Sequence, residues 1–177
     1  MRKLNPKEIL VPALSLFVIC VVIAGALAAV NAVTAGPIAE NLKKKAEAAR
    51  QEIFPGASFE ARKAREDTYY IASKDGALLG YCIDSEAQGY GGAIKLTVGL
   101  DAQGAVVKVQ VVNCDGETPG LGQKVKEVGF LSQFTGGKGS VEVDSIASAT
   151  YSSKGVQAAI NKALALYQNE IRGGAAG

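Results

Sequence analysis

The first pattern along the chain is an apolar run. Ile9 to Val33 spans about 25 residues without a charged side chain, and about 20 apolar residues suffice for a helix to cross a bilayer. A cleaved signal peptide is the alternative, with the small residues 28–32 as its cleavage region, but its apolar core is ordinarily shorter. We therefore expect a cytoplasmic flank and a retained transmembrane helix within residues 1–35.

A charged segment with a narrow apolar stripe follows the run. Gly36-Pro37 is expected to interrupt the helix, and Phe54-Pro55-Gly56 is expected to end the next one. We predict a juxtamembrane helix or linker over residues 36–56, which fits a solvated spacer and a partner-binding helix equally well. The apolar residues of its stripe are Ile38, Leu42, Ala46, Ala49 and Ile53.

Alternation of apolar and polar residues then predicts strands. Two short strands are expected over residues 58–74, and Asp75-Gly76 is a hairpin signal before a third strand ending at Asp84. Residues 86–92 are expected to form a loop. Two further strands, 93–100 and 105–112, are separated by a turn, which predicts an antiparallel meander.

Helical spacing returns after the strands. A helix is expected around residues 121–128, a short strand over Val141–Val143, and a long C-terminal helix capped by Ser152 or Ser153. The fold class is α+β: an antiparallel sheet with a helix between its later strands and a long helix packed against it, forming one domain over residues 57–177. The apolar face of the long helix is Val156, Ala159, Ile160, Ala163, Leu164 and Tyr167.

Composition narrows the possible functions. The net charge is only +2, which argues against binding to nucleic acid. The sequence contains no histidine, and histidine is the commonest general base and metal ligand in proteins. The three cysteines form no CxxC motif, so a zinc or iron–sulfur site is not expected. A Cys82–Cys114 disulfide stays open.

Small residues crowd the segment before the long helix, at 144–153. The N–H groups and dipole at a helix start favour an anion. A phosphate on or near the Thr150 hydroxyl would meet those groups, with Lys154 close by. An ordinary strand–turn–helix junction with a capping serine is the alternative.

This segment resembles the flavinylation motif of the RnfG and NqrC family of FMN-binding proteins, which reads roughly Asp-x-x-Ser/Thr-Gly-Ala-Thr-x-Ser/Thr. Asp144, Ala149, Thr150 and Ser152 match it. Ala147 stands where the family usually has Ser or Thr. Ser148 stands where it usually has Gly, which matters if that position needs a positive φ.

Two further segments resemble the same family in the same order. They are Gly89-Tyr90-Gly91-Gly92 and Glu117-Thr118-Pro119-Gly120-Leu121-Gly122, which in the family pack around the isoalloxazine ring. The resemblance implies that Thr150 carries FMN covalently through a phosphoester bond. Tyr90 and Leu121 would offer contact surface, and Glu117 and Thr118 would offer polar groups. The other expected FMN-binding residues are Ser148, Ala149, Tyr151, Ser152, Ser153, Lys154, Gly120, Gly122 and Gly91.

The resemblance also implies a cellular role. The chain would be an electron-transfer subunit, not an independent catalyst, within an ion-translocating, ferredoxin-oxidising Rnf-type complex of membrane and peripheral subunits. No histidine can activate the Thr150 hydroxyl, which fits attachment of FMN by a separate flavin transferase. The positive-inside count is indecisive, and the resemblance places the FMN domain on the outer side of the cell membrane, behind a single pass through the lipid bilayer.

Two other functions stay open. One is a stand-alone anchored flavoprotein that serves another redox partner. The other is a non-redox anchored binding module, which would carry no flavin. An independent hydrolase is disfavoured because the sequence offers no nucleophile–base pair.

Overall fold

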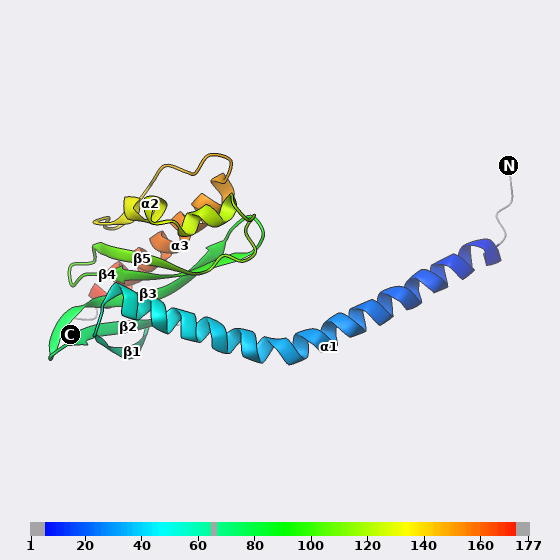
Figure 1. Ribbon diagram of the computed structural model, residues 1–177, viewed down its shortest axis with the longest axis horizontal. Helices are drawn as coiled ribbons and strands as arrows, with labels where there is room; N and C mark the ends of the chain where they lie inside the picture. The colour runs from blue at the N-terminus through cyan, green and yellow to red at the C-terminus, as the bar shows by residue number, and fades with distance from the viewer. Residues whose placement is uncertain (1–5, 65–66, 173–177) are drawn as a thin grey trace. The chain divides into compact units, whose positions relative to one another are not determined.

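The structure is a computed structural model that describes residues 6–64 and 67–172, with side chains from residue 10 onward (Figure 1). Its contacts divide the chain into two compact units, Met1–Asn41 and Leu42–Gly177. The first contains most of a long helix, and the second contains the sheet with its covering helices.

Helix α1 runs without interruption over Pro6–Ile53 and includes Pro12 and Pro37. The expectation that Gly36-Pro37 breaks the helix is therefore wrong. An internal proline removes one backbone hydrogen bond but need not end a helix, and the Ala-, Glu- and Lys-rich sequence that follows favours helix. Within the described residues this is the one helix long and apolar enough to cross a membrane, with a mean hydropathy of 2.8 over its most apolar window.

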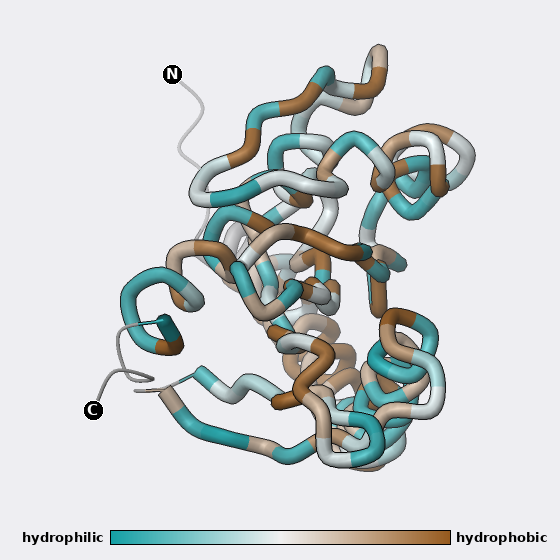
Figure 2. Tube along the Cα trace, turned by 90° about the vertical axis from the view of Figure 1, so that its left-hand side faces the viewer, coloured by the Kyte–Doolittle hydropathy of each residue, from teal (hydrophilic) through white to brown (hydrophobic). Residues whose placement is uncertain are grey.

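The sheet has five strands in the order β1-β2-β3-β4-β5, each antiparallel to the next. This confirms the predicted meander. β3 extends beyond Asp84 because it pairs with β4 as far as Gln88 and Ala93. Figure 2 colours the chain trace by hydropathy and shows hydrophobic and hydrophilic stretches interspersed along it. The strands are β1 (Ser58–Ala64), β2 (Asp67–Lys74), β3 (Ala77–Gln88), β4 (Ala93–Leu100) and β5 (Val106–Asn113).

One face of the sheet packs against α3 (Thr150–Leu166), which continues as a π-helical turn over Tyr167–Ile171. The predicted apolar face of this helix is buried in the main core. Burying such side chains contributes about 1.5–3 kcal/mol each relative to leaving them exposed. The largest fully buried side chains here include Phe134, Ile83, Ile94, Leu96, Leu100, Ile160 and Leu164.

The other face of the sheet packs against the end of α1. Ile53 and Phe54 form a second cluster with Ala72 and Cys82. Cys114 belongs to the main core instead, and both thiols are free. Burial raises the pKa of Cys82 to about 12, so this thiol stays protonated at neutral pH.

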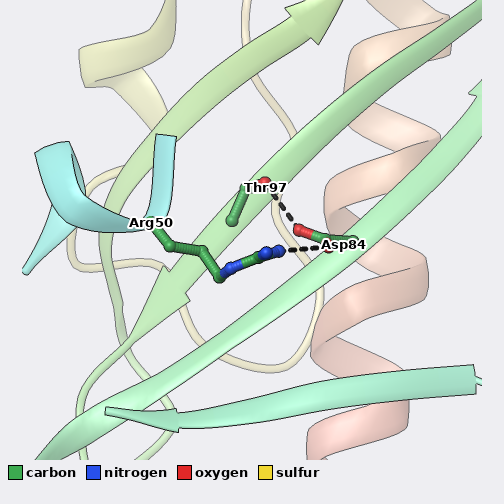
Figure 3. A network of polar contacts seen from close by, with 3 residues as sticks. All are labelled: Arg50, Asp84 and Thr97. Carbon is green, nitrogen blue, oxygen red and sulfur yellow. Dashed lines mark hydrogen bonds and ion pairs between the residues drawn. The ribbon is translucent and has the colours of Figure 1, made fainter. Parts of the chain in front are cut away.

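A partly buried ion pair joins the last turn of α1 to the sheet (Figure 3). Arg50 is only 4% exposed, and its Nη1 donates to Asp84 Oδ2 on β3 at 2.6 Å. Thr97 on β4 donates its hydroxyl to Asp84 Oδ1 at 2.7 Å. The guanidinium carbon lies 3.8 Å from the ring centroid of Tyr70 on β2. The apolar stripe of the juxtamembrane segment thus ends, at Ala49 and Ile53, inside the core.

The helical segment after β5 is shorter than predicted. It consists of a 3₁₀ turn, Gly122–Lys126, helix α2, Val128–Leu131, and another 3₁₀ turn, Ser132–Phe134. Val125 is fully buried but Val128 is 81% exposed, so these residues do not share one helical face.

The strand predicted at Val141–Val143 is absent from the described sheet, so α2 and α3 both follow the five strands, and no helix of the described residues lies between strands. The side chain of Asn161 on α3 takes the place of a neighbouring strand. Its Oδ1 accepts the Val141 N–H at 2.8 Å, and its Nδ2 donates to the Val141 carbonyl at 3.1 Å. Residues 135–149 therefore reach α3 as an irregular segment with turns, not as a sixth strand.

Candidate functional site

Thr150 is the first residue of α3, and Ala149 is its N-cap. The prediction that Ser152 or Ser153 caps this helix is wrong, because both lie buried within its first turn. Ser153 Oγ accepts the Ile146 N–H at 3.0 Å and donates to the Ala149 carbonyl at 3.0 Å. Thr150 consequently belongs to the helix instead of lying just ahead of it.

The first turn of α3 presents free backbone donors beside Thr150. The first bond within the helix runs from the Ser153 N–H to the Ala149 carbonyl at 2.9 Å. The N–H groups of Thr150, Tyr151 and Ser152 have no acceptor inside the helix, as at any helix start. Thr150 itself is exposed, so its hydroxyl lies where the helix dipole favours negative charge.

The backbone turns sharply at Ser148, which has a φ of 63°. The turn is closed by the Ala149 N–H, which donates to the Ile146 carbonyl at 2.9 Å. This position therefore does need the left-handed conformation that glycine adopts readily and serine does not.

We expect Ser148→Gly to raise the free energy of unfolding by about 1 kcal/mol, because it removes the steric cost of a Cβ at positive φ. Urea unfolding of the detergent-solubilised chain measures this. Ser145→Gly is the matched control, since Ser145 has no positive φ, and it is expected to lose about 0.5 kcal/mol through added chain entropy. A Ser148→Gly variant no more stable than the parent would contradict the strain argument.

The three segments singled out in the sequence meet around one hollow of about 280 Å³. The rings of Tyr90 and Tyr151 stand at its rim with centroids 6.4 Å apart, and they are 70% and 74% exposed. Leu121 adds a third apolar surface. The hollow is lined by Tyr90, Thr118, Leu121, Gly122, Ser148, Ala149, Thr150, Tyr151 and Ser152.

Close backbone contact brings two of these segments together. A Cβ on Gly91 would lie 1.8 Å from the Gly116 carbonyl oxygen, which no side chain tolerates. Gly91 therefore lets the loop before β4 press against the loop after β5. Sequence reasoning assigned no role to Gly116, although a glycine beside a motif is a signal of close approach.

Glu117 lies beneath the hollow. It is 1% exposed, and its Oε1 accepts the Gly91 N–H at 3.1 Å. Its Oε2 accepts the Tyr90 N–H at 3.3 Å and also the hydroxyl proton of Ser152. This one carboxylate thus contacts both other segments of the site.

The remaining candidate residues lie outside the lining. Gly91 and Ser153 pack behind the hollow through the contacts described above. Gly120 and Lys154 are exposed, and Gly120 adopts a positive φ of 73° in its turn. The hollow is therefore lined by nine of the predicted residues, with Glu117, Gly91 and Ser153 packed behind them.

The chemistry available here is that of binding. Across residues 6–64 and 67–172, no group of three or more His, Cys, Asp or Glu is placed to hold a metal ion. The hollow offers two aromatic rings, one aliphatic side chain and a helix start, which suit a flat aromatic ligand that carries a phosphate. Its volume is near the lower end of the ~300–1,000 Å³ typical of small-molecule sites, so part of such a ligand would stay exposed.

Comparison with known proteins gives two family matches. Residues 89–165 match the family model of the FMN-binding domain, and residues 1–53 match that of the RnfG N-terminal region. The G component of the Na(+)-translocating ferredoxin:NAD(+) oxidoreductase complex of Acetobacterium woodii is 33% identical, with 88% of this chain and 90% of the relative covered. The G component of the ion-translocating oxidoreductase complex of Escherichia coli K12 is 30% identical, with 64% and 63% covered.

Solved structures give a weaker likeness. The C component of the Na(+)-translocating NADH-quinone reductase from Parabacteroides distasonis is 23% identical, with a TM-score of 0.49 over 58% of this chain and 61% of that one. NqrC from Shewanella oneidensis is 21% identical, with the same TM-score over 61% of this chain and 65% of that one.

Proposed function

The chain belongs to the RnfG family of Rnf electron transport complex subunits, and from this premise we propose that it carries one FMN, bound covalently by a phosphoester to Thr150. The observation that supports the proposal is the position of Thr150 in the fold. Its exposed side chain lies at the start of α3, on the wall of the hollow where the three motif segments meet.

The residues present fit the two ends of FMN. Its phosphate would lie at the N–H groups of Thr150, Tyr151 and Ser152, where a helix start favours an anion. Its ring would contact Tyr90, Tyr151 and Leu121, with Thr118 as a polar neighbour. When bound, FMN supplies redox chemistry. The protein's part is to hold and orient the ring, which attachment through the phosphate leaves chemically free.

Thr150 serves in this proposal as the site of modification, not as a nucleophile activated by this chain. An alkyl hydroxyl is a weak nucleophile without an adjacent base, and the sequence contains no histidine. A separate flavin transferase would therefore attach the cofactor. A covalent tether suits a domain outside the cytoplasm, where lost FMN could not easily be replaced.

The proposed role is electron relay within an Rnf-type, ferredoxin-oxidising, ion-translocating complex. Two relatives are named as subunits of ion-translocating oxidoreductase complexes, which supports other membrane and peripheral subunits as partners. The exposed Tyr90 and Tyr151 leave one side of the hollow open, so a redox partner can approach the ring from there.

We further propose that α1 anchors the protein in the cell membrane by a single pass. The side chains of residues 10–33 are apolar and exposed almost throughout, which is favourable in lipid and costly in water. In this arrangement residues 1–35 are the flank and span, 36–56 the juxtamembrane segment, and 57–177 the FMN domain on the outer side.

Intact mass of the chain purified from its native host's membranes tests the proposal. The expected mass exceeds that of the sequence by one FMN minus water, and other complex subunits are expected to co-purify. Prior protease treatment of intact cells tests the orientation, since an outward FMN domain would be lost. An unshifted mass would contradict covalent attachment, and a shifted chain that purifies alone would favour the stand-alone flavoprotein.

A further inference from the structure

Glu117 is the point at which the three segments of the site are joined. We infer that it is a positioning residue: its carboxylate holds the loop 88–92 against the first turn of α3 and so sets the spacing of Tyr90 and Tyr151 before any cofactor is bound. The inference rests on the proposed function only for the identity of the ligand. The contacts that carry it belong to the chain itself.

The polar groups around the Glu117 side chain are all donors, which suits the two acceptor oxygens of a carboxylate. An ionised carboxylate only accepts hydrogen bonds, and three donors point at this one: the N–H groups of Tyr90 and Gly91 and the hydroxyl of Ser152. With 1% of the residue exposed, these bonds replace the hydration that the charge has lost. No Lys or Arg of the described chain lies within salt-bridge distance of it, so no ion pair contributes to holding it in place.

Packing alone does not hold the loop 88–92. After the end of β3 at Gln88 it consists of three glycines and Tyr90, whose side chain is 70% exposed. The Glu117 carboxylate packs directly against Gly89. A Cβ on Gly89 would lie 2.4 Å from Glu117 Oε1, so a larger residue does not fit at this position. The loop and the carboxylate are therefore fitted to each other.

One oxygen atom of Glu117 links the two backbone segments that carry the tyrosine rings of the hollow. Glu117 Oε2 accepts from the backbone of Tyr90 and from the side chain of Ser152, which is the neighbour of Tyr151. The backbone segments that carry the two rings are thus tied together through one acceptor. Releasing it would let the Tyr90 ring move away from Tyr151 and would widen the site.

Glu117→Gln is the sharpest change, because it keeps size and shape. An amide has one oxygen and one NH₂ group, so whichever way it turns, either the Tyr90 or the Gly91 N–H meets a donor. A buried N–H without an acceptor is expected to favour the open loop by about tenfold to a hundredfold.

Hydrogen exchange of backbone amides, followed by mass spectrometry on the full cofactor-free chain in detergent, measures this opening. In Glu117→Gln, exchange within 88–92 is expected to accelerate about tenfold to a hundredfold, while β4 stays as slow as in the parent. Ser152→Ala separates the two contacts of the carboxylate: it removes the bond from α3 but leaves the Tyr90 and Gly91 N–H groups with an acceptor, so the exchange of these two amides is expected to stay slow. Glu127→Gln, on an exposed residue nearby, is expected to change nothing.

Three results would overturn the inference. One is unchanged exchange of 88–92 in Glu117→Gln, and another is acceleration to the same extent across β4 and α3, which would mean general destabilisation. The third is that, in the parent chain, Tyr90 and Gly91 already exchange as fast as the exposed turn residue Ala102. None of these depends on FMN, so they are distinguishable from failure of the proposed function, which the parent's intact mass reports.

A spectroscopic readout follows in the flavin-loaded chain. A tyrosine beside the isoalloxazine ring quenches its fluorescence by donating an electron to the excited flavin. We expect Glu117→Gln to raise FMN fluorescence toward the level of a Tyr90→Leu variant while the covalent mass is retained. Equal fluorescence in Glu117→Gln and the parent, with Tyr90→Leu brighter than both, would also contradict a positioning role.

Discussion

Replacing Thr150 with alanine is expected to abolish the covalent FMN while leaving the domain folded. The phosphoester requires the hydroxyl oxygen, which alanine lacks. Because Thr150 is exposed, the change is expected to alter the free energy of unfolding by only about 0.5 kcal/mol. Intact mass of parent and variant, each co-expressed with a flavin transferase, gives an all-or-none comparison.

The matched control is Thr118→Ala, which removes another exposed threonine hydroxyl from the wall of the same hollow. It is expected to keep the full mass shift. A shift that persists in Thr150→Ala would assign the modification to another hydroxyl. A shift lost in both variants would mean that the enzyme recognises the shape of the hollow and not one oxygen.

Arg50→Ala is expected to cost about 3 kcal/mol of the free energy of unfolding. Breaking a buried ion pair typically costs about 3–5 kcal/mol, and the lower end applies because the Asp84 side chain is 36% exposed and can recover some hydration. The variant also removes the cation–π contact with Tyr70. Urea unfolding followed by tyrosine fluorescence measures it, because all 6 tyrosines lie after residue 57 and report on the domain.

Lys108→Ala is the control for this prediction. Lys108 also bonds to the end of α1, through Glu52 Oε1 at 2.9 Å, but both side chains are largely exposed. Exposed pairs contribute about 0–1 kcal/mol, so little change is expected. If Arg50→Ala and Lys108→Ala lowered the free energy of unfolding equally, burial of Arg50 would not add to the stabilisation by its ion pair.

The fold could be predicted largely where periodicity is strong. Alternation of Ile94, Leu96 and Val98 defined β4 to the residue, and Asp75-Gly76 marked the hairpin that the structure contains. The strand at Val141–Val143 was overpredicted because two β-branched residues on either side of Glu142 have the alternation of a strand. Only the position of Asn161, twenty residues later, shows that a helix side chain takes the strand partner's place.

The site was predictable as a set of segments but not as a geometry. The three motifs named the chain regions that meet, yet they do not reveal that Glu117 lies under the hollow instead of on its wall. That distinction depends on which backbone N–H groups face the carboxylate, a property of the folded loops. Arg50 was missed for a similar reason: on a charged helix it is indistinguishable from its solvated neighbours until the sheet is in place.

The order of elements along the chain has a consequence for biogenesis. All five strands precede α3, so a growing chain exposes the apolar face of the sheet until that helix emerges and docks. Thr150 opens the same helix, and the glycine loop and Glu117 that complete its surroundings come earlier. Under the proposed function, an enzyme that recognises the assembled hollow could act only on a finished domain, and attachment of the cofactor would then be a checkpoint on folding.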